Sequence, residues 1–210
     1  VSRLGPNGGN VYLYAVWRAK TYTVIYNLNC SPYSTYSHSG FTYDRSSPLK
    51  RVEELGFSRT GYDFAGWSTS SSGGVVYSNG QSVSTLGPNG GSVNLYAVWR
   101  AKTYYIYFNA NGGSGNMSSL GVTYNSGSKM LTSNAFTRAN NYFNCWNTSP
   151  NGSGTKYFEN QAVSNITSNI TLYAQWEETW NAHASASLSG SGTKNAPYLV
   201  AWEEDLAYIS

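Results

Sequence analysis

The sequence predicts a β-rich α+β fold, made of small modules in tandem that each hold several strands and one short helix. The first observation is a repeat: the stretch Leu13–Tyr22, LYAVWRAKTY, recurs unchanged at Leu95–Tyr104, and a shortened copy, LYAQW, lies at Leu172–Trp176. The tryptophans of the three copies are 82 and 77 residues apart, which indicates a domain copied in series. The second observation is the alternation of apolar and other residues that is typical of strands, and the third is a helix start at Ser47-Pro48.

The composition agrees with a turn-rich β protein and excludes several functional classes. The chain has 19 Tyr, 7 Trp and 7 Phe, and large aromatic side chains give a small module most of its buried area. Charged residues make up only 11%, and the net charge of +3 comes from scattered Lys and Arg, so we expect no nucleic-acid partner. No apolar run is long enough to span a membrane.

The repeat divides the chain into four parts. Residues 1–20 are interpreted as the end of a preceding repeat, 21–100 and 101–178 as complete repeats, and 179–210 as a linker and the start of a different domain. We expect strands at Val11–Trp17 and at Asn195–Val200, and a helical turn or two over Trp202–Ile209.

The first complete repeat opens with a strand over Tyr22–Leu28, whose alternate residues Tyr22, Val24, Tyr26 and Leu28 share one face. A polar loop over 29–40 and a short strand at 41–43 are expected to follow. Leu49–Leu55 is predicted as the helix, because Ser47-Pro48 supplies a start and Gly56 a stop.

The second half of this repeat holds its densest aromatic stretch. A turn at Thr60-Gly61 is expected to lead into a strand that contains Tyr62 and Phe64, and Gly66 beside Trp67 indicates a bulge or a close backbone approach. A turn at Asn79-Gly80 and a closing strand over Val93–Trp99 complete the repeat.

The second complete repeat keeps this plan with informative substitutions. Gly61 becomes Asn140 and Gly80 becomes Asn160, and Asn is the residue that best replaces Gly at positive φ. We therefore expect the same backbone conformation at both places. The region 126–133 is a weak helix candidate, and a turn there is the alternative.

These residues resemble the Listeria–Bacteroides repeat, also called the internalin B-repeat. The first repeat carries its pattern at Phe57, Arg59, Gly61, Tyr62, Phe64, Gly66, Trp67, Leu95, Tyr96, Ala97 and Trp99. The second carries it at Phe136, Arg138, Phe143, Trp146, Leu172, Tyr173, Ala174 and Trp176, and departs from it at Asn140, Asn141 and Cys145. The resemblance implies β-grasp-like modules, each a mixed sheet over one short helix. It also implies the stalk or adhesive segment of a secreted bacterial surface protein.

The sequence provides no catalytic, cofactor-binding or metal-binding set. His38 and His183 lie far apart without ligand-type neighbours, and Cys30 and Cys145 occupy non-equivalent positions, so free thiols are expected. The recurring Trp67, Trp99, Trp146 and Trp176 are interpreted as core residues, with sugar-stacking platforms as the alternative. The tyrosines that do not recur, Tyr33, Tyr36 and Tyr43, are the candidates for surface contact.

The predicted function is a non-catalytic stalk or adhesion array on the bacterial surface, outside the cell, that spaces and displays other domains. Only Arg100, Ala101 and Lys102 separate the repeats, so we expect a monomeric, semi-rigid rod and an elongated array. Host or neighbouring-cell proteins or glycans are the expected partners. The alternatives are a carbohydrate- or protein-binding module attached to a surface enzyme, and a virion or surface-layer decoration.

Overall fold

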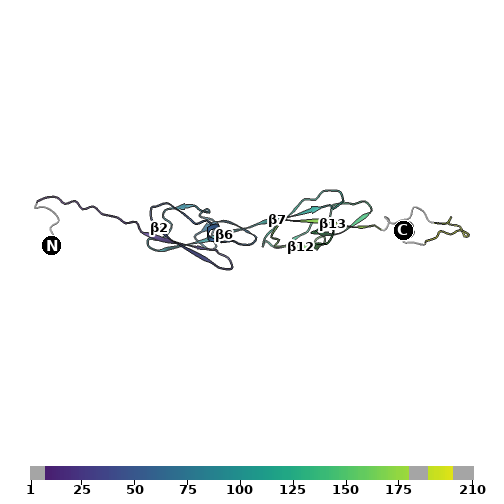
Figure 1. Cartoon of the computed structure of the whole chain (residues 1–210), viewed down its shortest axis with the longest axis horizontal. Helices are drawn as coiled ribbons and strands as arrows, with labels where there is room; N and C mark the ends of the chain where they lie inside the picture. Colours follow the sequence, from purple (N-terminus) through teal and green to yellow (C-terminus); the bar gives the residue numbers. More distant parts are fainter. Residues whose placement is uncertain (1–7, 180–188, 201–210) are drawn as a thin grey trace. The chain divides into compact units, whose positions relative to one another are not determined.

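The computed structural model describes residues 8–179 and 189–200, and its contacts separate the chain into two compact units. Of the described residues, one unit comprises 8–59 and 63–100, and the other comprises 60–62, 101–179 and 189–200. Figure 1 shows the strands of the first in purple to blue and those of the second in teal to green. Residues 21–100, apart from 60–62, lie in the first unit, and residues 101–178 lie in the second.

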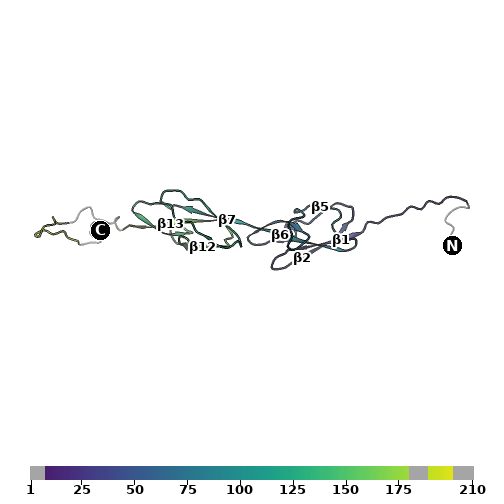
Figure 2. The same ribbon diagram turned by 180° about the vertical axis from the view of Figure 1, so that it is seen from behind.

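The first repeat is built on a four-stranded sheet with the order β2-β1-β6-β4. Figure 2 labels three of these strands, β1, β2 and β6. Its strands are β1 (Thr21–Asn27), β2 (Thr35–Thr42), β4 (Tyr62–Ser68) and β6 (Ser92–Ala101). β1 pairs antiparallel with β2 and parallel with β6, so the sheet is mixed, as the resemblance implied. A second, two-stranded sheet joins β3 (Ser47–Pro48) to β5 (Ser82–Val83). The strand β2 begins inside the segment predicted as a loop, because its residues pair with β1.

The second repeat has a five-stranded sheet with the order β11-β10-β13-β7-β8. Its strands are β7 (Thr103–Asn109), β8 (Leu120–Thr123), β10 (Asn141–Asn147), β11 (Lys156–Tyr157) and β13 (Ile170–Glu178). The first and last strands, β7 and β13, are again parallel neighbours. β9 (Lys129–Met130) and β12 (Ala162–Val163) form the small second sheet, so the region 126–133 holds turns and a strand instead of a helix.

The predicted α+β class is wrong, because the described residues contain no α-helix. Leu49–Leu55 forms only a 3-10 turn at Glu53–Leu55, which Gly56 ends with a left-handed backbone at φ 65°. Three amide N–H groups in this segment donate to partners distant in sequence: Leu49 to the Gln81 carbonyl, Lys50 to the Tyr26 hydroxyl oxygen and Val52 to the Asn79 side-chain oxygen. These tertiary bonds replace helical ones, and the fold is nearly all β, repeated and without the helix of a β-grasp-like module.

Each core is organised around a fully buried tryptophan. Trp67 packs edge-on against Tyr26 and Phe64, with ring centroids 4.9 Å from each. In the second repeat the centroid of Trp146 lies 4.9 Å from that of Phe108 and 4.8 Å from that of Phe143. The predicted inward face of β1 and the predicted core role of the recurring tryptophans are confirmed, with Trp99 and Trp176 half-buried at the core's edge.

The turns confirm the prediction made from the Gly-to-Asn substitutions. Gly61 and Asn140 have φ of 76° and 56°, and Gly80 and Asn160 have φ of 74° and 57°. Gly66 also lies where a close approach was expected, since a Cβ there would be 2.7 Å from the Tyr77 carbonyl oxygen. The backbone conformation therefore restricts which residue types these positions can hold.

Two expected strands outside the repeats do not form. The segment Val11–Trp17 has no strand partner among the described residues and its side chains are exposed. The segment 195–200 contributes only to isolated bridges, Ser189 with Leu199 and Thr193 with Ala196. The predicted helical turn at 202–209 and His183 lie outside the described residues.

Candidate functional site

The three tyrosines predicted for surface contact occupy different environments in the first repeat. Tyr33 lies in the loop between β1 and β2 and is 85% exposed. Tyr36, in β2, is about half exposed, and its ring lies 6.5 Å from that of Tyr26. Tyr43 follows the end of β2, where its hydroxyl donates to the Gly87 carbonyl over 2.7 Å. The length of β2 separates Tyr36 from Tyr43, so the three do not form one surface.

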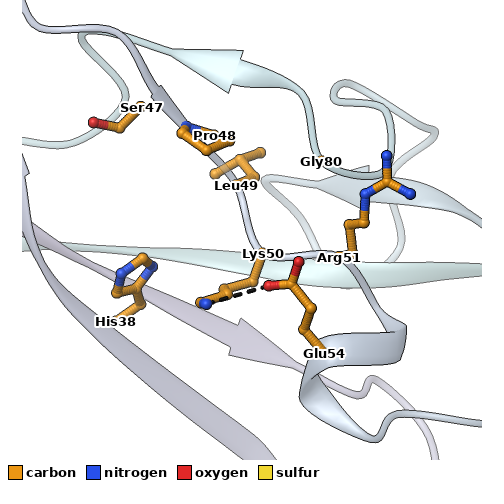
Figure 3. Close-up of a pocket in the computed structure, with 8 residues that line it drawn as sticks. All are labelled: His38, Ser47, Pro48, Leu49, Lys50, Arg51, Glu54 and Gly80. Carbon is orange, nitrogen blue, oxygen red and sulfur yellow. Dashed lines mark ion pairs between the residues drawn. The ribbon is translucent and has the colours of Figure 1, made fainter.

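The structure instead brings together a group of polar side chains around a half-open pocket of about 560 Å³ in the first repeat. Its walls come from β2, the β3 segment, the 3-10 turn and the Asn79-Gly80 turn (Figure 3). Eight residues line it: His38, Ser47, Pro48, Leu49, Lys50, Arg51, Glu54 and Gly80. The tertiary bonds that replace the helix also hold Lys50 and Arg51 in an extended segment at this pocket.

The charged groups of the pocket are arranged as one ion pair and one further cation. The Lys50 ammonium lies 3.2 Å from a carboxylate oxygen of Glu54, drawn as a dashed line in Figure 3. The Arg51 side chain lies against the turn, since a Cβ at Gly80 would be 3.2 Å from Arg51 Cγ. The guanidinium therefore leaves the lining with an excess of positive charge.

His38 is the neutral member of the lining. Burial lowers the pKa of its imidazole, the Lys50 charge lowers it further, and Glu54 opposes the change. Its Nδ1 atom is buried and has no hydrogen-bond partner among the described residues. The ring packs against that of Phe41, with the ring centroids 4.8 Å apart.

The second repeat has different side chains at the positions of His38, Lys50 and Arg51, and it has Lys129 at the position of Ser47. His38 lies opposite Val24, and the matching residue Ile106 lies opposite Leu120. The backbone hydrogen bond from Leu49 to Gln81 in the first repeat corresponds to the one from Leu131 to Gln161 in the second. In the residues that follow, Thr132 and Ser133 therefore take the positions of Lys50 and Arg51. The residues that carry charge in the pocket are thus dispensable for this fold.

The comparison with known families agrees with the repeat geometry. The family model of the Listeria-Bacteroides repeat domain matches residues 22–98 and 104–175, which together are more than half of the chain. The chain belongs to the Listeria-Bacteroides repeat family. Each match covers one of the two larger sheets and its small second sheet, and the repeat domain is typical of bacterial surface proteins.

This Listeria-Bacteroides repeat chain is also similar to a protein of Evansella cellulosilytica that is described by name as a Gly-rich membrane protein. The two are 31% identical over 141 residues, which cover 64% of this chain. The chain spans only 16% of the length of that relative. The similarity therefore concerns a small part of the larger protein.

Within the described ranges 8–179 and 189–200, other kinds of site are not found. No group of three or more His, Cys, Asp or Glu residues there could hold a metal ion. No helix there is long and apolar enough to cross a membrane. Cys30 and Cys145 are unpaired, and burial raises the pKa of the Cys145 thiol, which leaves it protonated at neutral pH.

The pocket of this Listeria-Bacteroides repeat was not predicted, because a helix was expected over Leu49–Leu55, the segment that contains Lys50, Arg51 and Glu54. His38 is distant from this segment in sequence, and only the folding of β2 brings it to the same pocket. The available signal was the comparison of the repeats, since charge at Lys50 and Arg51 is replaced by Thr132 and Ser133 in an otherwise matching segment.

Proposed function

We propose that this chain is a non-catalytic stalk array in a secreted, multidomain bacterial surface protein, where it spaces and displays other domains under mechanical load. The domains that the array displays would adhere to a protein or glycan of a host or neighbouring cell. The observation that carries this proposal is the pairing of the first and last strands of each repeat.

The terminal strands of the first repeat are parallel neighbours, with Thr23 opposite Ser92 at one end of the ladder and Asn27 opposite Tyr96 at the other. Tension along the chain pulls β1 at its start and β6 at its end. Because the strands are parallel, these two pulls act in opposite directions along the ladder. They load its hydrogen bonds together in shear, whereas an antiparallel terminal pair would open one bond at a time.

The second repeat has the same arrangement, with Ile106 opposite Ile170 and Asn109 opposite Tyr173. Only Lys102 lies between the end of β6 and the start of β7. A pull therefore passes from the last strand of one repeat to the first strand of the next without a flexible linker to absorb it. A series of shear-loaded repeats suits a surface stalk.

Single-molecule force spectroscopy on the chain held at its two ends tests this proposal. We expect two unfolding events, each releasing the length of one repeat, at forces several-fold above those of an unzipping geometry. In the matched control the force is applied at residues 20 and 92, which precede or begin β1 and β6 at the same end of the ladder. This geometry unzips the two strands one hydrogen bond at a time. Equal forces in the two geometries would refute the load-bearing function.

Display on the cell is tested separately in the full-length protein. Removal of residues 22–98 is expected to reduce the access of an antibody to an epitope tag in the displayed domain on whole cells. Unchanged access after removal of one repeat and of both would show that spacing is not the function.

A further inference from the structure

We propose that the pocket of the first repeat, between His38, Arg51 and Glu54, binds a carboxylate-bearing saccharide. This inference goes beyond the stalk function and does not depend on it. It rests on the volume of the pocket, on the charges of its lining and on the replacement of His38, Lys50 and Arg51 in the second repeat.

The excess positive charge selects an anionic group. Lys50 is paired with Glu54, whereas Arg51 makes no ion pair within 4 Å among the described residues, and the Glu53 carboxylate outside the lining acts on it only at longer range. A guanidinium presents a planar set of N–H donors that matches the two oxygens of a carboxylate. Gly80 leaves room for the Arg51 stem to lie against the turn.

The remaining lining favours a ligand that also carries hydroxyl groups. The Glu54 carboxylate can accept hydrogen bonds from the hydroxyl groups of a sugar. The Ser47 side chain in the lining adds a hydroxyl that can bond a sugar hydroxyl. A sugar with one carboxylate satisfies both kinds of group, because it brings one negative charge and several hydroxyls.

The size of the pocket and its restriction to one repeat support a ligand site. A volume of about 560 Å³ lies in the range of small-molecule sites. The second repeat closes the same fold with Leu120, Thr132 and Ser133 at the positions of His38, Lys50 and Arg51. The shared fold therefore does not require these three polar side chains.

The test titrates the chain with a galacturonate oligosaccharide and follows amide chemical shifts of the first repeat by NMR. We expect saturable shifts at the residues that line the pocket. Two further probes separate the contributions of the sugar and of the negative charge: the neutral galactose oligosaccharide of the same length, and inorganic phosphate. Each is expected to bind at least roughly tenfold more weakly than the galacturonate oligosaccharide.

The variants are taken from the second repeat, which shows that the fold accepts them. Arg51→Ser and His38→Leu are each expected to weaken galacturonate binding, the first by roughly tenfold. The matched control is Arg45→Ser, because Arg45 lies outside the pocket and its amide bond to Thr42 recurs as that of Ser126 to Thr123. Amide spectra without sugar establish that each variant is folded.

Three results would overturn the proposal: no saturable binding of galacturonate, equal binding of the neutral sugar or of phosphate, or equal loss of affinity in Arg45→Ser and Arg51→Ser. None of these results would change the unfolding forces, so a failure here is distinguishable from a failure of the stalk proposal.

Discussion

The indole nitrogen of Trp99 donates a hydrogen bond to the carbonyl oxygen of Leu28 over 2.8 Å. Trp176 and Ala110 make the same bond at the same length in the second repeat. Leu28 directly follows β1 and Trp99 lies in β6, so the bond joins the end of the first strand to the last strand beyond the parallel ladder. It belongs to the pair of strands on which the stalk proposal depends.

Replacing Trp99 by Phe removes this bond while keeping an aromatic ring. We expect a loss of about 1–3 kcal/mol in the free energy of unfolding, since the Leu28 carbonyl loses a donor at a half-buried site. Urea unfolding of the chain measures the loss, and hydrogen exchange of the β6 amides assigns it to the first repeat. The control Trp17→Phe changes the same ten-residue sequence where the side chain is 90% exposed, and is expected to have no effect beyond about 0.5 kcal/mol. Equal effects at both positions would contradict the assigned bond.

Asn29 fixes the loop after β1 by two bonds from its side-chain amide, 2.9 Å to the Ser71 carbonyl and 3.1 Å to the Ala97 carbonyl. Its backbone has φ 58°, so Asn29→Gly removes the bonds without backbone strain. We expect this variant to lower the free energy of unfolding by about 1–2 kcal/mol. Asn29→Ala is expected to cost roughly 1 kcal/mol more, because alanine resists positive φ. Identical stabilities of the two variants would show that φ at this residue has no energetic role.

Gly80 tests whether a positive φ restricts the residue type at this turn in both repeats. Asn occupies the equivalent position 160, so Gly80→Asn is expected to cost less than about 1 kcal/mol, whereas Gly80→Val is expected to cost about 2 kcal/mol or more at φ 74°. Thermal unfolding of both variants ranks them. A valine variant as stable as the asparagine variant would contradict this restriction.

Tyr26 makes the stability of the first repeat dependent on alkaline pH. Burial raises the pKa of its phenol to about 12 from 10.0, and the bond from the Lys50 amide only partly opposes this. The pKa of this phenol is higher in the folded chain than in the unfolded chain. The neutral phenol therefore contributes its full amount to the free energy of unfolding below pH 10, and this contribution decreases as the pH rises towards 12. The loss is on the order of 2 kcal/mol.

The comparison variant for this pH dependence is Tyr26→Phe, which copies Phe108 of the second repeat. Urea unfolding from pH 9 to pH 12 is expected to show a steeper decline for the native chain than for this variant. Parallel declines would mean that the tyrosine titrates alike in the folded and unfolded chain.

The repeat pattern allowed much of the fold to be predicted. Alternation placed Tyr22, Val24 and Tyr26 on the inward face of β1, because period-2 patterning depends only on strand geometry. The replacement of glycine by asparagine between the repeats, as at Asn160, predicted which turns have a positive φ. The helix prediction at Leu49–Leu55 failed because cap and stop residues are local signals, and the tertiary bonds to Gln81, Tyr26 and Asn79 outweighed them. The pocket depends on the same tertiary bonds and was missed with them.

The stretch LYAVWRAKTY separates what the sequence determined from what tertiary structure decided. The sequence by itself determined the period, the strand faces and the family, because these depend on residue order. Leu13 is 79% exposed and outside any strand, whereas Leu95, in the identical stretch, is fully buried in β6. The difference is the neighbouring strand: β6 pairs with β1, and no described strand pairs with residues 11–17. A β-strand obtains its hydrogen bonds and its burial from a partner, so only the folded repeat decides where this sequence becomes one.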